Sequence, residues 1–126
     1  MKDAPNPQVV KWLDRQPRTS IWTTSLTIFE IRFGFQILPS GKRRERLAKA
    51  FETLLAHKLE RRIATFDSAA ARHTADLMAA RQTAGRPGDL RDSMIAGIAL
   101  AANASLATRN TKHFDDLRIP VINPWL

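Results

Sequence analysis

The sequence predicts an α/β fold in which a parallel sheet is flanked by helices. Four short runs rich in β-branched and apolar residues, at residues 20–24, 62–66, 105–109 and 120–123, alternate with segments that have helical character. Strands separated by helices pair in parallel, because each helix carries the chain back to the starting end of the sheet. The length of 126 residues suits one core, so we expect residues 1–126 to form a single domain.

The first elements follow from local signals. Asn6 followed by Pro7 is a typical helix start, because asparagine caps a helix and proline is tolerated at its first position. This predicts a helix over residues 7–16. Residues 20–24 form the first expected strand, and a second helix is expected over residues 27–38.

A proline-serine-glycine turn then leads into a third helix. Its apolar residues recur at helical spacing and predict a stripe that packs inward, formed by Leu47, Phe51, Leu54 and Leu55. After the strand at residues 62–66, Asp67 is expected to cap a fourth helix that ends near Ala84. A loop at residues 85–89 precedes a fifth helix, which contains Asp92 and ends near Asn103.

The formal net charge of +8 favours a polyanionic partner, and nucleic acid is the first candidate. Residues 41–62 hold most of this excess, with eight basic and three acidic residues. An ordinary solvated helix face is the alternative interpretation. The absence of cysteine excludes disulfides and thiolate chemistry. The absence of a long apolar run or an export signal leads us to expect a cytoplasmic protein with no membrane association.

Glu30 lies in the middle of the second expected helix. Its neighbours one or two turns away on the same face are apolar or small, namely Leu26, Phe33, Gly34 and Ile37. Arg32 marks the opposite, solvent side of the helix. We therefore expect Glu30 on the packed side, where a glutamate is rare unless it is paired or bound to a metal. A buried Glu–Arg ion pair and a metal ligand are the two alternatives.

Asp92 opens a helix that is otherwise apolar. If Asp89 is the N-cap, Asp92 is the third helical residue, where a carboxylate suits the helix dipole. Helix capping and metal ligation are both open for Asp92. Asn110 directly follows the strand at residues 105–109, at the edge of a parallel sheet where functional groups gather. It is also a common residue type in turns.

Other chemistries lack a motif. His57, His73 and His113 have no metal-ligand spacing, so we expect them at the surface or in structural roles. The sequence contains no nucleophile elbow, Walker loop or dinucleotide-binding glycine pattern.

Several strings together resemble a PIN domain, and most closely the FitB/VapC-like toxins of bacterial type II toxin–antitoxin systems. In the order and spacing of that family, the chain contains LTIFEIRFGFQILPSGKRRERL, RIATFD, AGRPGDLRDSMIAGIA, LATRN and INPW. The resemblance covers nearly the whole chain and implies a PIN-like parallel sheet flanked by helices.

The resemblance also implies an activity, which is metal-dependent hydrolysis of RNA phosphodiester bonds. Glu30, Asp92 and Asn110 match the catalytic and metal-binding positions of the family, which hold Mg²⁺ or Mn²⁺. The implied RNA-binding residues are Lys42, Arg43, Arg44, Arg46 and Arg109. The implied partners are the RNA substrate, a cognate antitoxin and a second copy of the chain in a homodimer.

The sequence departs from the family at its start. The family begins with an apolar strand that ends in an aspartate, whereas this chain begins at Met1, beyond that strand. We therefore expect a truncated form that lacks the first, central strand, leaving the strands near residues 21–24 and 106–108 about 10 Å apart. The first site acid is missing with it, so we expect impaired nuclease activity.

A second departure lies after Asn110, where the family often has an acid three residues on and this chain has His113. Asp115 and Asp116 follow closely and are candidates to compensate. Two alternatives to an active ribonuclease therefore stay open. One is a catalytically inactive PIN-like module that binds an antitoxin or RNA, and the other is a basic RNA-binding domain in which Glu30 is structural.

Overall fold

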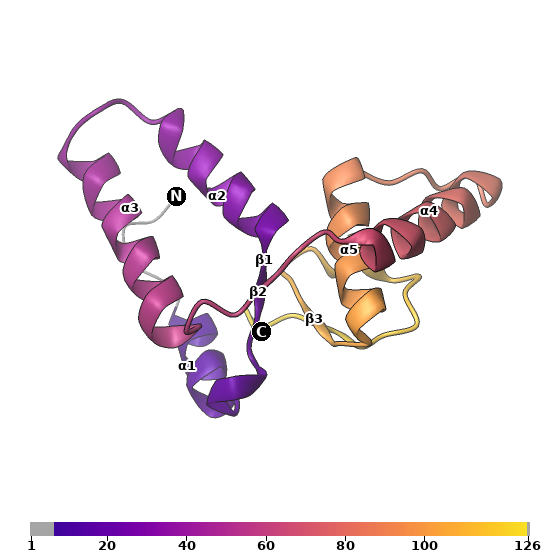
Figure 1. Ribbon diagram of the computed structural model, residues 1–126, viewed down its shortest axis with the longest axis horizontal. Helices are drawn as coiled ribbons and strands as arrows, with labels where there is room; N and C mark the ends of the chain where they lie inside the picture. Colours follow the sequence, from indigo (N-terminus) through magenta and orange to yellow (C-terminus); the bar gives the residue numbers. More distant parts are fainter. Residues whose placement is uncertain (1–6, 126) are drawn as a thin grey trace. The chain divides into compact units, whose positions relative to one another are not determined.

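The computed structural model describes residues 7–125, and the chain divides into two compact units. Unit 1 comprises the described residues up to Ala64, and unit 2 comprises those from Thr65 onward. Figure 1 shows the elements of both units coloured along the sequence. Each unit contains one pair of parallel strands together with the helices that pack beside it.

Unit 1 contains three α-helices and two strands. Its elements are α1 (Pro7–Arg15), a 3-10 turn (Arg18–Ser20), β1 (Thr23–Thr24), α2 (Ser25–Gln36), α3 (Lys42–Thr53), the π-helical turn η2 (Leu54–Lys58) and β2 (Ile63–Ala64). Thr24 caps α2 by accepting a hydrogen bond from the backbone N–H of Thr27. The expected cap Asn6 lies outside the described residues, whereas Pro7 is the first residue of α1 as predicted.

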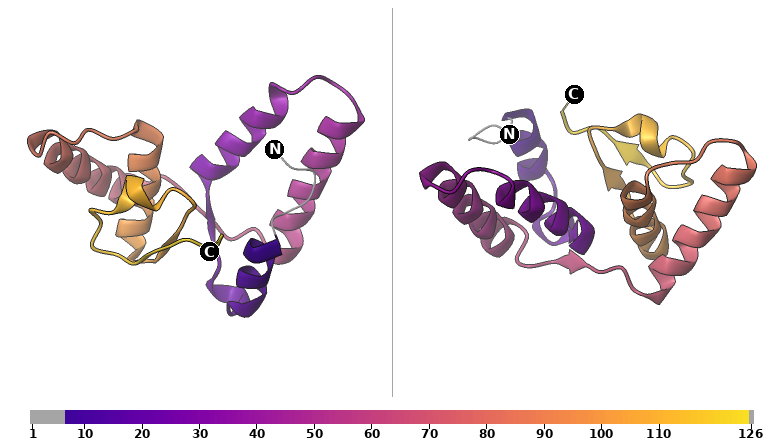
Figure 2. Two further views of the ribbon diagram at one scale, coloured as in Figure 1. Left: turned by 180° about the vertical axis from the view of Figure 1, so that it is seen from behind. Right: turned by 90° about the horizontal axis from the view of Figure 1, so that it is seen from above.

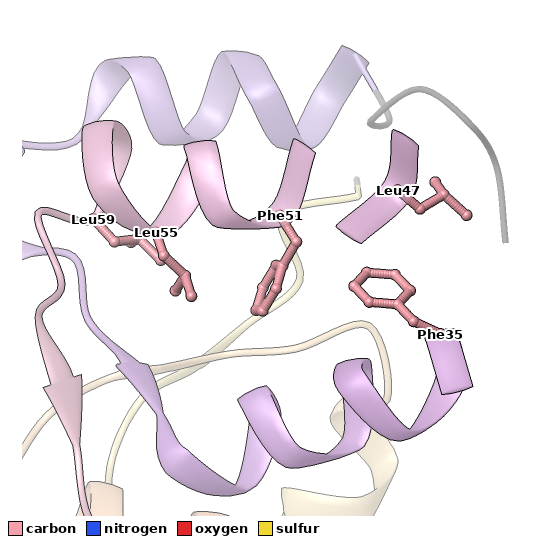
Figure 3. Close-up of a cluster of buried hydrophobic side chains, with 5 residues drawn as sticks. All are labelled: Phe35, Leu47, Phe51, Leu55 and Leu59. Atoms are coloured by element: carbon pink, nitrogen blue, oxygen red, sulfur yellow. The ribbon is translucent and has the colours of Figure 1, made fainter. Parts of the chain in front are cut away.

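The core of unit 1 lies between α2 and α3, as Figure 3 shows. The rings of Phe35 and Phe51 meet edge to face, with their centroids 5.9 Å apart. Leu47, Phe51 and Leu55 are buried, which confirms most of the stripe predicted for this segment, whereas Leu54 is 36% exposed. The same apolar face extends through η2 to Leu59.

The packed face of α2 differs from the one predicted around Glu30. Ile28, Ile31 and Phe35 contribute to the core of unit 1, because they lie on the side of α2 that meets α3. Phe33 and Ile37, which were expected to pack around Glu30, are 53% and 69% exposed. The expectation was wrong for these two residues, since contact with α3 selects another side of the helix.

Unit 2 contains two long helices and the second strand pair. Its elements are α4 (Ser68–Thr83), α5 (Leu90–Ala102), β3 (Leu106–Ala107), the 3-10 turn η3 (Thr111–Phe114) and β4 (Val121–Ile122). The two views of Figure 2 show α4 and α5 side by side. Asp67 caps α4 as predicted, because its side chain accepts a hydrogen bond from Ala70 N at 2.9 Å.

Alpha-helices α4 and α5 approach each other closely at Gly97. A Cβ atom built on Gly97 would clash with the Thr74 side chain and lie 2.7 Å from the carbonyl oxygen of Ala70. Below this contact, Ala99 and Leu100 pack with Ile119 in the core of unit 2. The close contact fixes α5, and with it the helix start that carries Asp92.

All four predicted strands are present, but each is only two residues long. The pairing is parallel, as the alternation of strands and helices predicted. No helix within residues 7–125 is both long and apolar enough to cross a membrane.

Candidate functional site

Two acidic residues at the N-terminus of α5, Asp89 and Asp92, have different structural roles. Asp89 is the N-cap, and its Oδ1 accepts a hydrogen bond from the backbone N–H of Asp92 at 3.1 Å. This cap satisfies one of the open amide groups of the first turn. The carboxylate of Asp92 is therefore not the cap, and its contacts lie elsewhere.

The carboxylate of Asp92 meets the imidazole of His113. His113 Nδ1 lies 2.9 Å from Asp92 Oδ2. The other oxygen, Oδ1, accepts no hydrogen bond from the described residues. Both side chains line a pocket of about 280 Å³ in unit 2, and polar residues dominate its wall: Arg81, Arg86, Asp89, Asp92, Lys112, His113, Asp115 and Asp116, with Pro87 and Gly88.

Arg81 is the buried centre of this pocket wall, with 5% of the residue exposed. Its Nε and Nη2 donate to the two oxygens of Asp116, each at 2.8 Å. Nη2 also donates to the carbonyl oxygen of His113 at 2.9 Å, and Nη1 donates to Ser93 Oγ at 3.2 Å. One guanidinium group thus joins α4 to the start of α5 and to η3.

Hydrogen bonding with Arg81 lowers the pKa of Asp116, against the opposing effect of partial burial. The same contact raises the pKa of Arg81, and the negative charges of Asp115 and Asp92 add to it. The positive charge of Arg81 is therefore matched by a carboxylate of its own.

The backbone of the loop before α5 passes close to the guanidinium group of Arg81. A Cβ atom on Gly88 would lie 2.8 Å from Arg81 Nη1, so glycine lets the backbone pass close to this side chain. Arg86 in the same loop pairs with Asp115 at 2.9 Å in an exposed position. Asp115 and Asp116 are therefore both paired with arginines, and their expected compensation for the acid of the family stays a prediction.

Asn110 starts the turn that carries His113. Its carbonyl oxygen accepts a hydrogen bond from the backbone N–H of His113 at 3.0 Å. Its own backbone N–H donates to Thr108 Oγ1 at 3.1 Å, and its side chain is exposed. The turn places Asn110 three residues from a side chain that contacts Asp92.

Glu30 is half-buried on α2. No arginine in the described part of unit 1 pairs with it, so the buried Glu–Arg alternative is not observed there. Arg32 lies on the solvent side, as predicted, and pairs with Glu52. Because Glu30 belongs to unit 1 and Asp92 to unit 2, the convergence of Glu30, Asp92 and Asn110 stays a prediction.

The predicted RNA-binding residues divide between the two units. Lys42, Arg43 and Arg46 are exposed along α3, and the half-buried Arg44 donates to Gln36. Arg109 is exposed after β3, with its guanidinium carbon 5.9 Å from the centre of the Trp125 ring. A larger pocket of about 550 Å³ in unit 1 is lined by apolar residues such as Leu13, Ile21 and Trp22 and by an equal number of polar residues.

The donors near Asp92 suit a hard divalent cation in kind, because carboxylate and amide oxygens are the ligands that Mg²⁺ and Mn²⁺ prefer. Within the described residues, neither unit brings three acidic or imidazole side chains together to hold a metal ion.

Sequence reasoning missed Arg81 and assigned His113 only a surface or structural role. Nothing in the alanine-rich segment around Arg81 signals a buried guanidinium. The position of His113, three residues after Asn110, was the available signal for its place beside Asp92.

Comparison with known proteins agrees with this fold. The PIN domain family model matches residues 2–119. A relative from Sinorhizobium fredii, named VapC ribonuclease Y4jK, is 36% identical over 98% of this chain and 89% of its own length. Toxin FitB from Neisseria gonorrhoeae is 30% identical over 99% of this chain and 90% of its own length.

A solved structure extends the similarity to the backbone. The crystal structure of FitAcB from Neisseria gonorrhoeae matches 98% of this chain and 89% of its own, with a TM-score of 0.87 and 30% identity. The family match, the relatives and the fold agree with one another. The chain belongs to the PIN-domain family and, within it, to the group of the VapC and FitB toxins.

Proposed function

We propose that this protein is a metal-dependent ribonuclease toxin of a toxin–antitoxin pair that hydrolyses RNA phosphodiester bonds. The observation that carries the proposal is the Asp92 carboxylate, which lines a polar pocket while Asp89 caps the helix. Among residues 7–125, its Oδ2 contacts His113 and its Oδ1 accepts no hydrogen bond. The names of the relatives support the reaction class. RNA as the substrate makes the cytoplasm the proposed compartment.

In this proposal Glu30, Asp92 and Asn110 supply oxygen ligands to Mg²⁺ or Mn²⁺. The ion, when bound, lowers the pKa of a coordinated water and neutralises charge on the attacked phosphate. Asp92 and Glu30 contribute the negative charge that holds it, and the Asn110 amide contributes a neutral oxygen.

The test is cleavage of a fluorescent RNA by the purified protein with Mg²⁺, with Mn²⁺ and with EDTA. Asp92→Asn and Glu30→Gln are each expected to reduce the rate by about 10²–10³-fold, because each removes a charged ligand worth several kcal/mol. Asp76→Asn, an exposed acid on α4, is the matched control and should keep the rate. Cleavage that persists in EDTA, or in Asp92→Asn, contradicts the proposal.

The basic residues are proposed to hold the RNA backbone: Lys42, Arg43, Arg44, Arg46 and Arg109. The exposed part of this set along α3 supports a contact with phosphates. Replacing Lys42 and Arg46 by glutamine should lower the slope of log affinity against log salt by about 1.4, or about 0.7 for each lost contact with a single strand. An unchanged slope would remove these two residues from the proposed RNA surface.

A second candidate function is an inactive PIN-like module that binds an antitoxin or RNA. His113 in place of an acid, and the engagement of Asp115 and Asp116 by arginines, favour it, because both reduce the charge available to a cation. Under this alternative the protein pairs with its antitoxin without cleaving RNA. Copurification with a candidate antitoxin, and light scattering for the proposed homodimer, test the partners directly.

A further inference from the structure

The hydrogen bond between His113 and Asp92 has a definite direction. An ionised carboxylate only accepts hydrogen bonds, so His113 Nδ1 carries the proton and donates it to Asp92 Oδ2. The bond therefore occupies one of the two oxygens of Asp92.

Both partners of this bond are anchored through their backbones. The carbonyl oxygen of His113 accepts a hydrogen bond from the buried Arg81, and its backbone N–H donates to the carbonyl of Asn110. On the other side, the backbone N–H of Asp92 donates to Asp89. The imidazole and the carboxylate therefore meet in a geometry that their main chains support.

The charged neighbours do not compete for this contact. Asp116 binds Arg81 through both oxygens, and Asp115 binds Arg86. His113 is 56% exposed at its side chain, so packing alone does not hold its ring where it lies. The hydrogen bond with Asp92 therefore accounts for the orientation of this exposed ring.

We propose that His113 is a positioning residue for the metal ligand Asp92. Its Nδ1–H holds Oδ2, so that the carboxylate offers Oδ1 alone to the cation. This inference rests on the proposed function, in which Asp92 binds a divalent ion. It accords with the near-octahedral geometry that Mg²⁺ demands and with the general role of hydrogen-bond partners in orienting metal ligands.

The test measures binding of Mn²⁺ alone, from the electron paramagnetic resonance signal of the free ion, without RNA. His113→Ala should weaken Mn²⁺ affinity by about 10–100-fold, as loss of a partner that orients a ligand typically does. His113→Asn places an amide N–H near the position of Nδ1 and should retain most of the affinity. His113→Gln places its amide nearer the position of Nε2 and should behave as His113→Ala does.

Rescue by asparagine separates positioning from other roles. If His113→Asn loses as much affinity as His113→Ala, or if His113→Ala binds as the parent does, the inference is overturned. The asparagine and glutamine variants decide the matter even where the alanine variant unfolds, and circular dichroism checks the fold of each.

Mn²⁺ binding by Asp92→Asn separates a failure of the proposed function from a failure of the positioning role of His113. If Asp92→Asn binds Mn²⁺ as tightly as the parent, Asp92 is not a ligand and the proposed function fails together with the inference. If Asp92→Asn loses binding while His113→Ala keeps it, the inference alone fails.

Discussion

At the scale of single residues, the start of α5 shows how two nearby acids take different roles. The side chain of Asp89 caps the helix, and the carboxylate of Asp92 contacts His113 instead. The same three-residue spacing was compatible with capping by either acid. The direction of the side chains, rather than the residue types, assigns the roles.

Arg81 is expected to contribute far more to stability than Arg86. Arg81→Met leaves Asp116, Ser93 Oγ and the His113 carbonyl without their donor, and should cost about 2–4 kcal/mol, since Asp116 stays partly accessible to water. Arg86→Met removes only an exposed ion pair and should cost about 0–1 kcal/mol. Urea denaturation of both variants measures the difference, and equal losses would contradict the role assigned to Arg81.

The ion pair between Arg81 and Asp116 is expected to make the stability of the protein depend on pH. Arg81 lowers the pKa of Asp116 below its ordinary value of 3.8, so its stabilising effect is complete above that value and is lost as pH falls through the lowered pKa. Asp116→Asn should therefore be less stable than the parent at neutral pH, and the gap should narrow below about pH 4. Urea midpoints measured from pH 7 to pH 2.5 check this, with Asp115→Asn as the exposed control. If the difference in stability between the parent and Asp116→Asn stays constant across this pH range, the prediction is wrong.

At the scale of elements, the close approach of α4 and α5 positions the site. Glycine is normally unfavourable inside a helix, yet Gly97 allows the neighbouring helix to come near. The site residues at the start of α5 and the Arg81 end of α4 depend on this packing. The sequence showed the small residues of α5 but not which helix they face.

Gly97→Ala should destabilise the protein although alanine is the better helix former. The added Cβ would clash with Thr74 and lie 2.7 Å from the backbone oxygen of Ala70, and overpacking of this kind costs about 1–3 kcal/mol. Thr74→Ala removes one of the two clashes, so the double variant should lose less than the sum of the single changes. Thermal melts of the three variants test this, and a stabilised Gly97→Ala would show that the helices can separate at no cost.

At the scale of the whole molecule, the strands lie in two parallel pairs, β1 with β2 and β3 with β4. Within the described residues each of these strands has one hydrogen-bonded neighbour, so each pair leaves two strand edges without a backbone partner.

The sequence by itself determined the elements and their class, because helix caps, apolar periodicity and strand runs are local signals. Asp67 and Asp89 cap the predicted helices, and all four strands appear in parallel pairs. It also identified Asp92 and Asn110 as candidate site residues. In the structure, Asn110 starts the turn that carries His113, and His113 contacts Asp92. Only the tertiary structure showed that Arg81 is buried, that His113 contacts Asp92 and that α2 packs through Ile28, Ile31 and Phe35. These facts depend on partners up to 35 residues apart in sequence, and local patterns carry no information on such contacts.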